Sequence, residues 1–139
     1  MSLMSRVHTL LHTARPARGE LERGSAAVEA IMIIPVVLLI FFGLIQGAVV
    51  LQANNVAQAA ASTAYNSARL YDASSEDGVS AGEAALTQAG SIVSGSNVVV
   101  QRTAETVTVT VTGTVATLLP GLPVTVSRTV TGPTERWVQ

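Results

Sequence analysis

The stretch AIMIIPVVLLIFFGLIQGAVVL, residues 30–51, decides the fold of this chain of 139 residues. Gln46 is its one polar side chain, and no charged side chain occurs between Ala30 and Ala68. The stretch is long enough to cross the ~30 Å hydrocarbon core of a bilayer, which takes about 20 helical residues. Because a backbone in lipid must satisfy its own hydrogen bonds, we expect this stretch to be a membrane-spanning helix.

Two other interpretations of the apolar stretch stay open on the sequence alone. It could be the buried core helix of a soluble protein, although a small core does not need so long an uncharged run. It could also belong to a secretory signal peptide, because Ala57-Gln58-Ala59 resembles an A-x-A cleavage site and would give a secreted protein cut near Ala59. However, the polar N-terminal region is unusually long, and the apolar run exceeds the usual length of about 7–15 residues.

The charges predict the direction in which the chain crosses the membrane. Residues 1–24 contain Arg6, Arg15, Arg18 and Arg23 against Glu20 and Glu22. By the positive-inside rule, the N-terminus lies in the cytoplasm and the C-terminal part is extracytoplasmic. The formal net charge is only −1, so overall charge gives no reason to expect a nucleic-acid partner.

Helical signals continue beyond the apolar stretch. Residues 50–71 contain no Gly or Pro and are rich in Ala, the best helix former. We expect one helix from about Ala26 to about Tyr71, with a possible bend at Pro35. Small residues recur along it at helical spacing, at Ala53, Ala57, Ala60, Ala64 and Ala68. This stripe would let another helix approach closely, but we favour its packing onto the C-terminal domain of the same chain.

The remaining residues predict a small α+β domain. The polar segment Ala73–Glu83 is expected to be a surface loop with Gly78 at a turn or helix end. A short helix is expected over Ala81–Val93, and a turn over Ser94–Asn97. Three strands then follow, over Asn97–Thr103, Glu105–Thr117 and Pro123–Gly132.

The second strand has the clearest pattern of the three. Val107, Val109 and Val111 alternate with threonines, which is typical of a strand with one buried face. Gly113 is expected to mark a bulge, and Leu118–Pro123 a turn. The fold class is therefore α+β, with a long N-terminal transmembrane helix, a second short helix and a three-stranded antiparallel sheet.

The sequence gives little support to catalysis. There is no cysteine, and the two histidines, His8 and His12, lie in the N-terminal tail without a third ligand nearby. With no histidine beyond the membrane stretch, a Ser-His-Asp triad is excluded there. Glu76 and Asp77 have the character of solvated loop charges. We therefore expect no enzyme, cofactor, metal site or small-molecule substrate.

Glu29 is the unusual residue, because it stands at the start of the apolar run. A charge deep in a bilayer costs at least ~2.5–3.5 kcal/mol on insertion scales. At the membrane surface the carboxylate could instead reach the headgroups. A more specific interpretation gives Glu29 a positive partner on another chain, such as the free α-amino group of a chain cut just before the apolar run.

The N-terminal pattern is similar to the start of a known family. Gly24-Ser25, with Glu29 five residues into the chain that would begin at Ser25, resembles a type IV pilin-like leader. The stretch ERGSAAVEAIMIIPVVLLIFFGLIQ resembles TadE-like proteins, minor pilins or pseudopilins of the Tad (Flp) pilus. The resemblance rests on Arg23, Gly24, Ala26, Ala27, Val28, Glu29 and Pro35. Ser67-Ala68-Arg69 and the C-terminal GPTERWV resemble two further elements of that family.

The resemblance implies a role for each matching residue. Gly24 would precede the bond that a prepilin peptidase cuts, and Ser25 would become the new N-terminus. Glu29 would pair with the amine of a neighbouring subunit and set the axial register between helices. Ser25 departs from the pattern, because major type IV pilins prefer an aromatic residue or Met there.

This resemblance divides the chain into a cytoplasmic leader, a transmembrane helix, an extracytoplasmic continuation of the helix and a small α+β domain, over residues 1–24, 25–51, 52–72 and 73–139. It implies a single-pass minor pilin that helps to assemble, initiate or cap a Tad-type pilus or related secretion apparatus. Other pilin-like subunits, the peptidase and the membrane would be its partners. The alternative is an uncleaved, membrane-tethered binding domain that displays a Thr-rich sheet.

Overall fold

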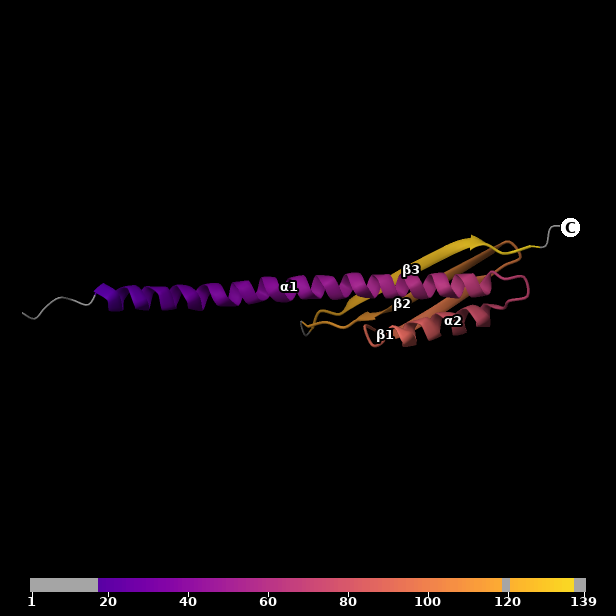
Figure 1. The fold of residues 1–139 in the computed structure, drawn as a ribbon. Helices are drawn as coiled ribbons and strands as arrows, with labels where there is room; N and C mark the ends of the chain where they lie inside the picture. The colour runs from indigo at the N-terminus through magenta and orange to yellow at the C-terminus, as the bar shows by residue number, and fades with distance from the viewer. Residues whose placement is uncertain (1–17, 119–120, 137–139) are drawn as a thin grey trace, which may run out of the picture. The chain divides into compact units, whose positions relative to one another are not determined.

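The computed structural model describes residues 18–118 and 121–136, with side chains from residue 24 onward. These residues form two helices and three strands, which are α1 (Arg18–Ala68), α2 (Ser75–Gln88), β1 (Val93–Arg102), β2 (Thr106–Val115) and β3 (Val124–Pro133) (Figure 1). The chain divides within α1 into two units, residues 1–40 and 41–139. The predicted α+β class, with a long N-terminal helix, a second helix and a three-stranded antiparallel sheet, is confirmed.

The first unit contains the beginning of α1. The helix starts at Arg18, earlier than the predicted Ala26, because residues 18–25 include the good helix formers Glu, Leu and Arg. Pro35 lies inside α1, and helical structure continues on both sides of it. Among the described residues, α1 is the one helix long and apolar enough to cross a membrane.

The second unit has its core between the later part of α1, α2 and one face of the sheet. Ala53, Ala57, Ala60, Ala61, Ala64 and Ala68 of α1 are at most 1% exposed. The predicted buried face of β2 is confirmed, because Val107, Val109 and Val111 are fully buried in the same cluster. In Figure 1 the two helices lie on the same side of the sheet. Because the alanine side chains are short, helix and sheet can approach closely.

α2 begins much earlier than the sequence suggested, and the predicted loop over Ala73–Glu83 is wrong from Ser75 onward. Ser74 is the N-cap, and its hydroxyl accepts a hydrogen bond from the Asp77 backbone N–H at 3.2 Å. The Asp77 carboxylate accepts one in return from the Ser74 backbone N–H at 2.7 Å. This capping box satisfies two backbone donors at the helix start, so Asp77 has a structural role and is more than a solvated charge.

Gly78 and Gly82 lie inside α2, so the predicted turn at Gly78 is also wrong. Both are buried where α2 meets α1. A Cβ atom at Gly78 would lie 2.8 Å from the Ala68 Cβ, and one at Gly82 would lie 3.1 Å from the Ala64 Cβ. These glycines are therefore contact residues, and the close approach of the helices compensates for their poor helix propensity.

The sheet is antiparallel, with the strand order β1-β2-β3. The predicted turn over Ser94–Asn97 is wrong, because these residues belong to β1. The pairing of β1 with β2 is irregular between Ser94 and Asn97, and Gly95 has a positive φ of 55° there. Gly113 of β2 pairs in continuous register with Val126, so the predicted bulge lies opposite Gly113, in β1.

Candidate functional site

The residues predicted for cleavage and assembly all lie on α1. Gly24, Ser25 and Glu29 are exposed, and a Cβ atom at Gly24 would have nothing within 4 Å. Among the side chains that the structure describes, from residue 24 onward, Glu29 forms no ion pair. The residues are thus accessible on a helix surface, and their predicted roles stay predictions.

The surface around Glu29 is strongly apolar. Large side chains from Val28 to Leu44 are 43–72% exposed, with Ile31 and Met32 the most exposed. The most apolar part of α1, which is long enough to span a membrane, is not buried inside the chain's own fold. A surface of this kind is suited to lipid or to neighbouring apolar helices. We call this the exposed apolar segment of α1; its large exposed side chains are Val28, Ile31, Met32, Ile33, Ile34, Val36, Val37, Leu38, Leu39, Ile40, Phe41, Phe42 and Leu44.

The alanine stripe of α1 is buried, in contrast to the exposed apolar segment. Ala53, Ala57, Ala60, Ala64 and Ala68 all lie in the core of the second unit, against α2 and the sheet. The stripe is covered by the chain's own domain in this structure, which is the interpretation favoured from the sequence. Cleavage near Ala59 would remove Ala53 and Ala57 from this core.

Gln46 connects the apolar run to the loop that follows β2. Its side-chain amide donates to the Ala116 carbonyl oxygen at 3.4 Å and accepts from the Leu118 backbone N–H at 2.9 Å. Both ends of one amide group therefore hold the same loop beside α1. The sequence signalled Gln46 as the single polar side chain of the run, but it did not indicate the partner.

Arg102 closes the C-terminal end of α1, and sequence analysis missed it. Its Nε donates to the Ala68 carbonyl at 2.9 Å, and a terminal nitrogen donates to the carbonyls of Leu70 and Tyr71 at 3.0 and 3.3 Å. These oxygens belong to the last residue of α1 and to two residues just after it, where carbonyl groups lack intrahelical donors. A guanidinium also complements the negative end of the helix dipole. No basic residue of α1 itself occupies its last turn, so Arg102 from β1 takes that position.

A second group of contacts joins the Ala68-Arg69 element to the GPTERWV segment, of which Trp137 and Val138 lie outside the described residues. Arg69 forms an ion pair with Glu135 at 2.9 Å, and the Glu135 backbone N–H donates to the Arg69 carbonyl at 2.9 Å. The Tyr65 hydroxyl donates to the Pro133 carbonyl at 3.1 Å. Hydrogen bonding with the Tyr65 side chain and the charge of Glu135 raise the pKa of Arg69. The two family-like elements therefore meet at one end of the domain.

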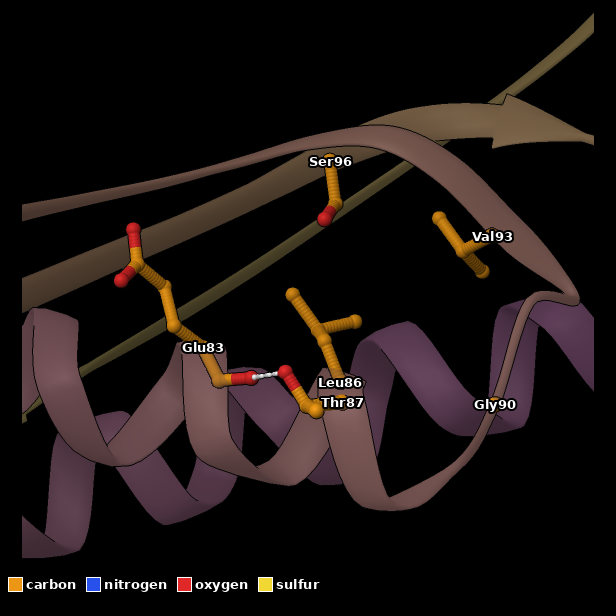
Figure 2. A pocket seen from close by; sticks show the side chains of 6 residues that line it. All are labelled: Glu83, Leu86, Thr87, Gly90, Val93 and Ser96. Atoms are coloured by element: carbon orange, nitrogen blue, oxygen red, sulfur yellow. Dashed lines mark hydrogen bonds between the residues drawn. The ribbon is translucent and has the colours of Figure 1, made fainter.

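One hollow, of about 330 Å³, lies between the end of α2 and the start of β1 (Figure 2). Leu86 and Val93 form its apolar part, and Ser96 and the Glu83 carboxylate lie at its side. The Thr87 hydroxyl donates to the Glu83 backbone carbonyl at 2.9 Å, so it is used within α2. Glu83 is the sole titratable group among the lining residues, and a pair for acid–base chemistry is missing there.

No group of three or more His, Cys, Asp or Glu residues that could hold a metal ion occurs among residues 18–118 and 121–136. The features with a clear chemical character are therefore the exposed apolar segment of α1, Glu29 within it, and the contacts that fix the domain to α1.

Comparison with known proteins gives a match that covers the apolar segment of α1. The family model described as TadE-like protein matches residues 24–65. No significant match was found among curated proteins or among solved structures. The matched segment begins at Gly24 and contains Glu29, Pro35, Gln46 and most of the alanine stripe. Over residues 24–65 the chain is therefore similar to TadE-like proteins, and the resemblance predicted from its sequence is confirmed for this segment.

Proposed function

We propose that this chain is a membrane-anchored, pilin-like subunit that helps to assemble, initiate or cap a Tad-type pilus or a related secretion apparatus. The observation that carries the proposal is a coincidence of position. The TadE-like match begins at Gly24, the residue at which the predicted leader ends, and the exposed apolar segment of α1 begins four residues later, at Val28.

In this proposal a prepilin peptidase cuts between Gly24 and Ser25. The absence of any contact for a Cβ atom at Gly24 supports access to that bond, although the peptidase would have to unwind α1 locally. The cut would create a free amine at Ser25, next to the apolar segment. Glu29 of a neighbouring subunit would then pair with that amine, and each charge would lower the cost of placing the other in lipid.

The exposed apolar segment supplies the surface for neighbouring helices. Small and β-branched residues lie along it, and Gly43 and Gly47 have no neighbour within 4 Å of a Cβ position. Glycines on an exposed membrane helix allow close helix contacts, as in other membrane interfaces. The domain of residues 41–139 is carried along as a folded unit, because Gln46 and Arg102 fix it to α1 at both ends of the sheet.

The direct test is the intact mass and N-terminal sequence of the full chain from membranes with and without the prepilin peptidase. A chain that starts at Ser25 only when the peptidase is present supports the proposal. A chain that starts at Met1 in both cases contradicts it and favours the uncleaved, tethered binding domain. A chain that starts near residue 60 supports secretion instead.

The role of Glu29 is tested separately with Glu29→Gln and with Glu83→Gln as the matched control. Glu83 is an exposed carboxylate of the outer domain. We expect Glu29→Gln to be cleaved normally but to lose co-purification with other pilin-like subunits, while Glu83→Gln retains it. Equal co-purification of both variants would rule out a pairing role for Glu29.

A further inference from the structure

An apolar corner of the outer domain has no function in the proposal above. Leu118 and Leu122 belong to the connection between β2 and β3 and are 52% and 63% exposed. Large exposed leucines on a small domain indicate a contact surface when they gather at one place. Both lie at the same end of the sheet, where Val115 pairs with Val124.

Gln46 places this corner beside the apolar run. Its two hydrogen bonds hold Ala116 and Leu118 against α1 at the level of residue 46. The neighbouring α1 residues Phe42 and Leu44 are exposed and belong to the same unit as the corner. The corner is therefore continuous with the end of the segment that the membrane covers.

The distribution of charged residues also makes this end of the domain apolar. No charged residue occurs in residues 84–101 or 106–127, which form most of β1, all of β2 and the start of β3. Charged side chains gather at the opposite end of the sheet, where Arg102, Glu105 and Arg136 lie near the end of α1. Arg128 pairs in register with Val111, in the middle of the sheet. The end of β2 and the start of β3, which lie nearest to Gln46, thus carry no formal charge, and the Glu83 carboxylate lies at the hollow beside Val93 and Ser96.

We propose that Leu118 and Leu122 insert into the membrane interface beside α1, so that the lipid surface is the partner of this corner. The domain then has two membrane contacts, the helix and the corner, and it is held against the bilayer instead of swinging on α1. An apolar surface inserts about 5–10 Å into the boundary between headgroups and acyl chains. The inference requires the membrane anchor but not assembly into a pilus.

Insertion also defines where the lipid-covered part of α1 ends. Val49 and Val50 pack partly against the core of the domain, so lipid cannot surround α1 there. The predicted end of the membrane segment at Leu51 then moves back to about Gln46. Residues 24–45 still provide the length of about 20 residues that a bilayer requires.

The test uses the absence of native cysteine in the chain. Leu122→Cys and Leu118→Cys each receive an environment-sensitive fluorophore in the full chain, reconstituted in phosphatidylcholine vesicles. Leu44→Cys, in the apolar run, is the control for lipid contact. Ala104→Cys is the control for water contact, because Ala104 is exposed in the turn between β1 and β2, at the far end of the sheet. All replaced residues are exposed, so the fold should tolerate the changes.

We expect blue-shifted emission at positions 118 and 122, and at least about twofold stronger quenching by nitroxide-labelled phosphatidylcholine than at position 104, as for interfacial insertion. Quenching by aqueous iodide should follow the reverse order. The proposal is overturned if position 122 behaves like position 104. It is also overturned if position 122 is shielded from both quenchers, because a protein partner would then cover the corner.

Discussion

The two parts of α1 differ in a way that hydrophobicity alone does not explain. Ile31 and Met32, in the first part, are large and apolar and are 71% and 72% exposed. Ala57 and Ala64, in the second part, are small and are completely buried. The more apolar residues are therefore left outside, and the less apolar ones form the core of the folded unit.

The difference indicates that the two parts of the helix have different surroundings. The first part needs a low-dielectric surrounding that the chain does not supply, which is consistent with a membrane or with neighbouring helices. The second part is covered by its own domain, and close approach of backbones matters more there than the area of each side chain. Side-chain size is therefore limited in the second part by the close packing of the domain, and in the first part it is not.

The largest expected effect comes from filling the closely packed second part. Ala60→Leu places three more carbon atoms at a position that is 1% exposed, which should cost about 3 kcal/mol of unfolding free energy through overpacking. Hydrogen exchange of the β2 amides in the full chain measures this loss. Ala59→Leu is the matched control, because Ala59 is exposed and the change should stay within about 0.5 kcal/mol.

If Ala60→Leu were as harmless as Ala59→Leu, the domain would not close on the alanine face. The stripe would then be available to another helix, and the comparison of the two parts would fail.

The closely packed part was also where prediction from sequence was least successful. The segment Ser75–Glu83 has the composition of a loop. Local propensity cannot reveal that Ala64 and Ala68 of α1 lie against its glycines. The apolar run and the Val–Thr alternation of β2 were predicted well, because a single regular pattern within one segment determines each. The predicted bulge was assigned to Gly113, whereas the irregularity lies opposite it in β1, at Gly95, because the sequence does not reveal which of two paired strands carries the extra residue.

The next effect concerns the end of α1. Arg102→Met keeps an unbranched side chain but removes the donors to Ala68, Leu70 and Tyr71. Because these are hydrogen bonds from a charged group, we expect a loss of about 2 kcal/mol. Hydrogen exchange and urea unfolding of the full chain in detergent measure it. Arg136→Met removes an exposed pair with Glu105 and should cost about 0.5 kcal/mol or less. Similar losses in the two variants would contradict the capping role.

A smaller and more local effect is expected at the boundary of the two parts. Gln46→Leu removes both hydrogen bonds to the loop but makes the membrane run more apolar. Insertion of α1 should be unchanged, while the loop loses about 1–2 kcal/mol of local stability. Faster exchange of the Leu118 amide would show this. Gln52→Leu, at an exposed position of the same helix, should leave that amide unchanged. If Gln52→Leu speeds the exchange of that amide as Gln46→Leu does, the effect comes from helix hydropathy and not from the two hydrogen bonds.

The candidate site was predictable to the extent that it is local. Gly24, Ser25 and Glu29 follow one another on a single segment, so their spacing could be recognised without a fold. The partners of Gln46, Arg69 and Arg102 lie 31–72 residues away along the chain. No single-sequence pattern encodes pairings at such separations, and only the packing of the sheet on α1 brings them together.

The smallest expected effect tests α2 through pH. Both Ser74 groups donate to the Asp77 carboxylate, and the bond from the Ser74 backbone, followed by that from its hydroxyl, lowers the pKa of Asp77 below its ordinary value of 3.8. These bonds favour the charged form, so they stabilise the fold above pH 3.8. The contribution is lost as pH falls below 3.8 through the lower folded-state pKa.

Hydrogen exchange of α2 across this range should therefore depend on pH more steeply in the wild type than in Asp77→Asn. Glu76→Gln, which keeps the capping box, should retain the wild-type steepness, and an equally flat profile for it would assign the effect to general charge at the helix start instead of to the box.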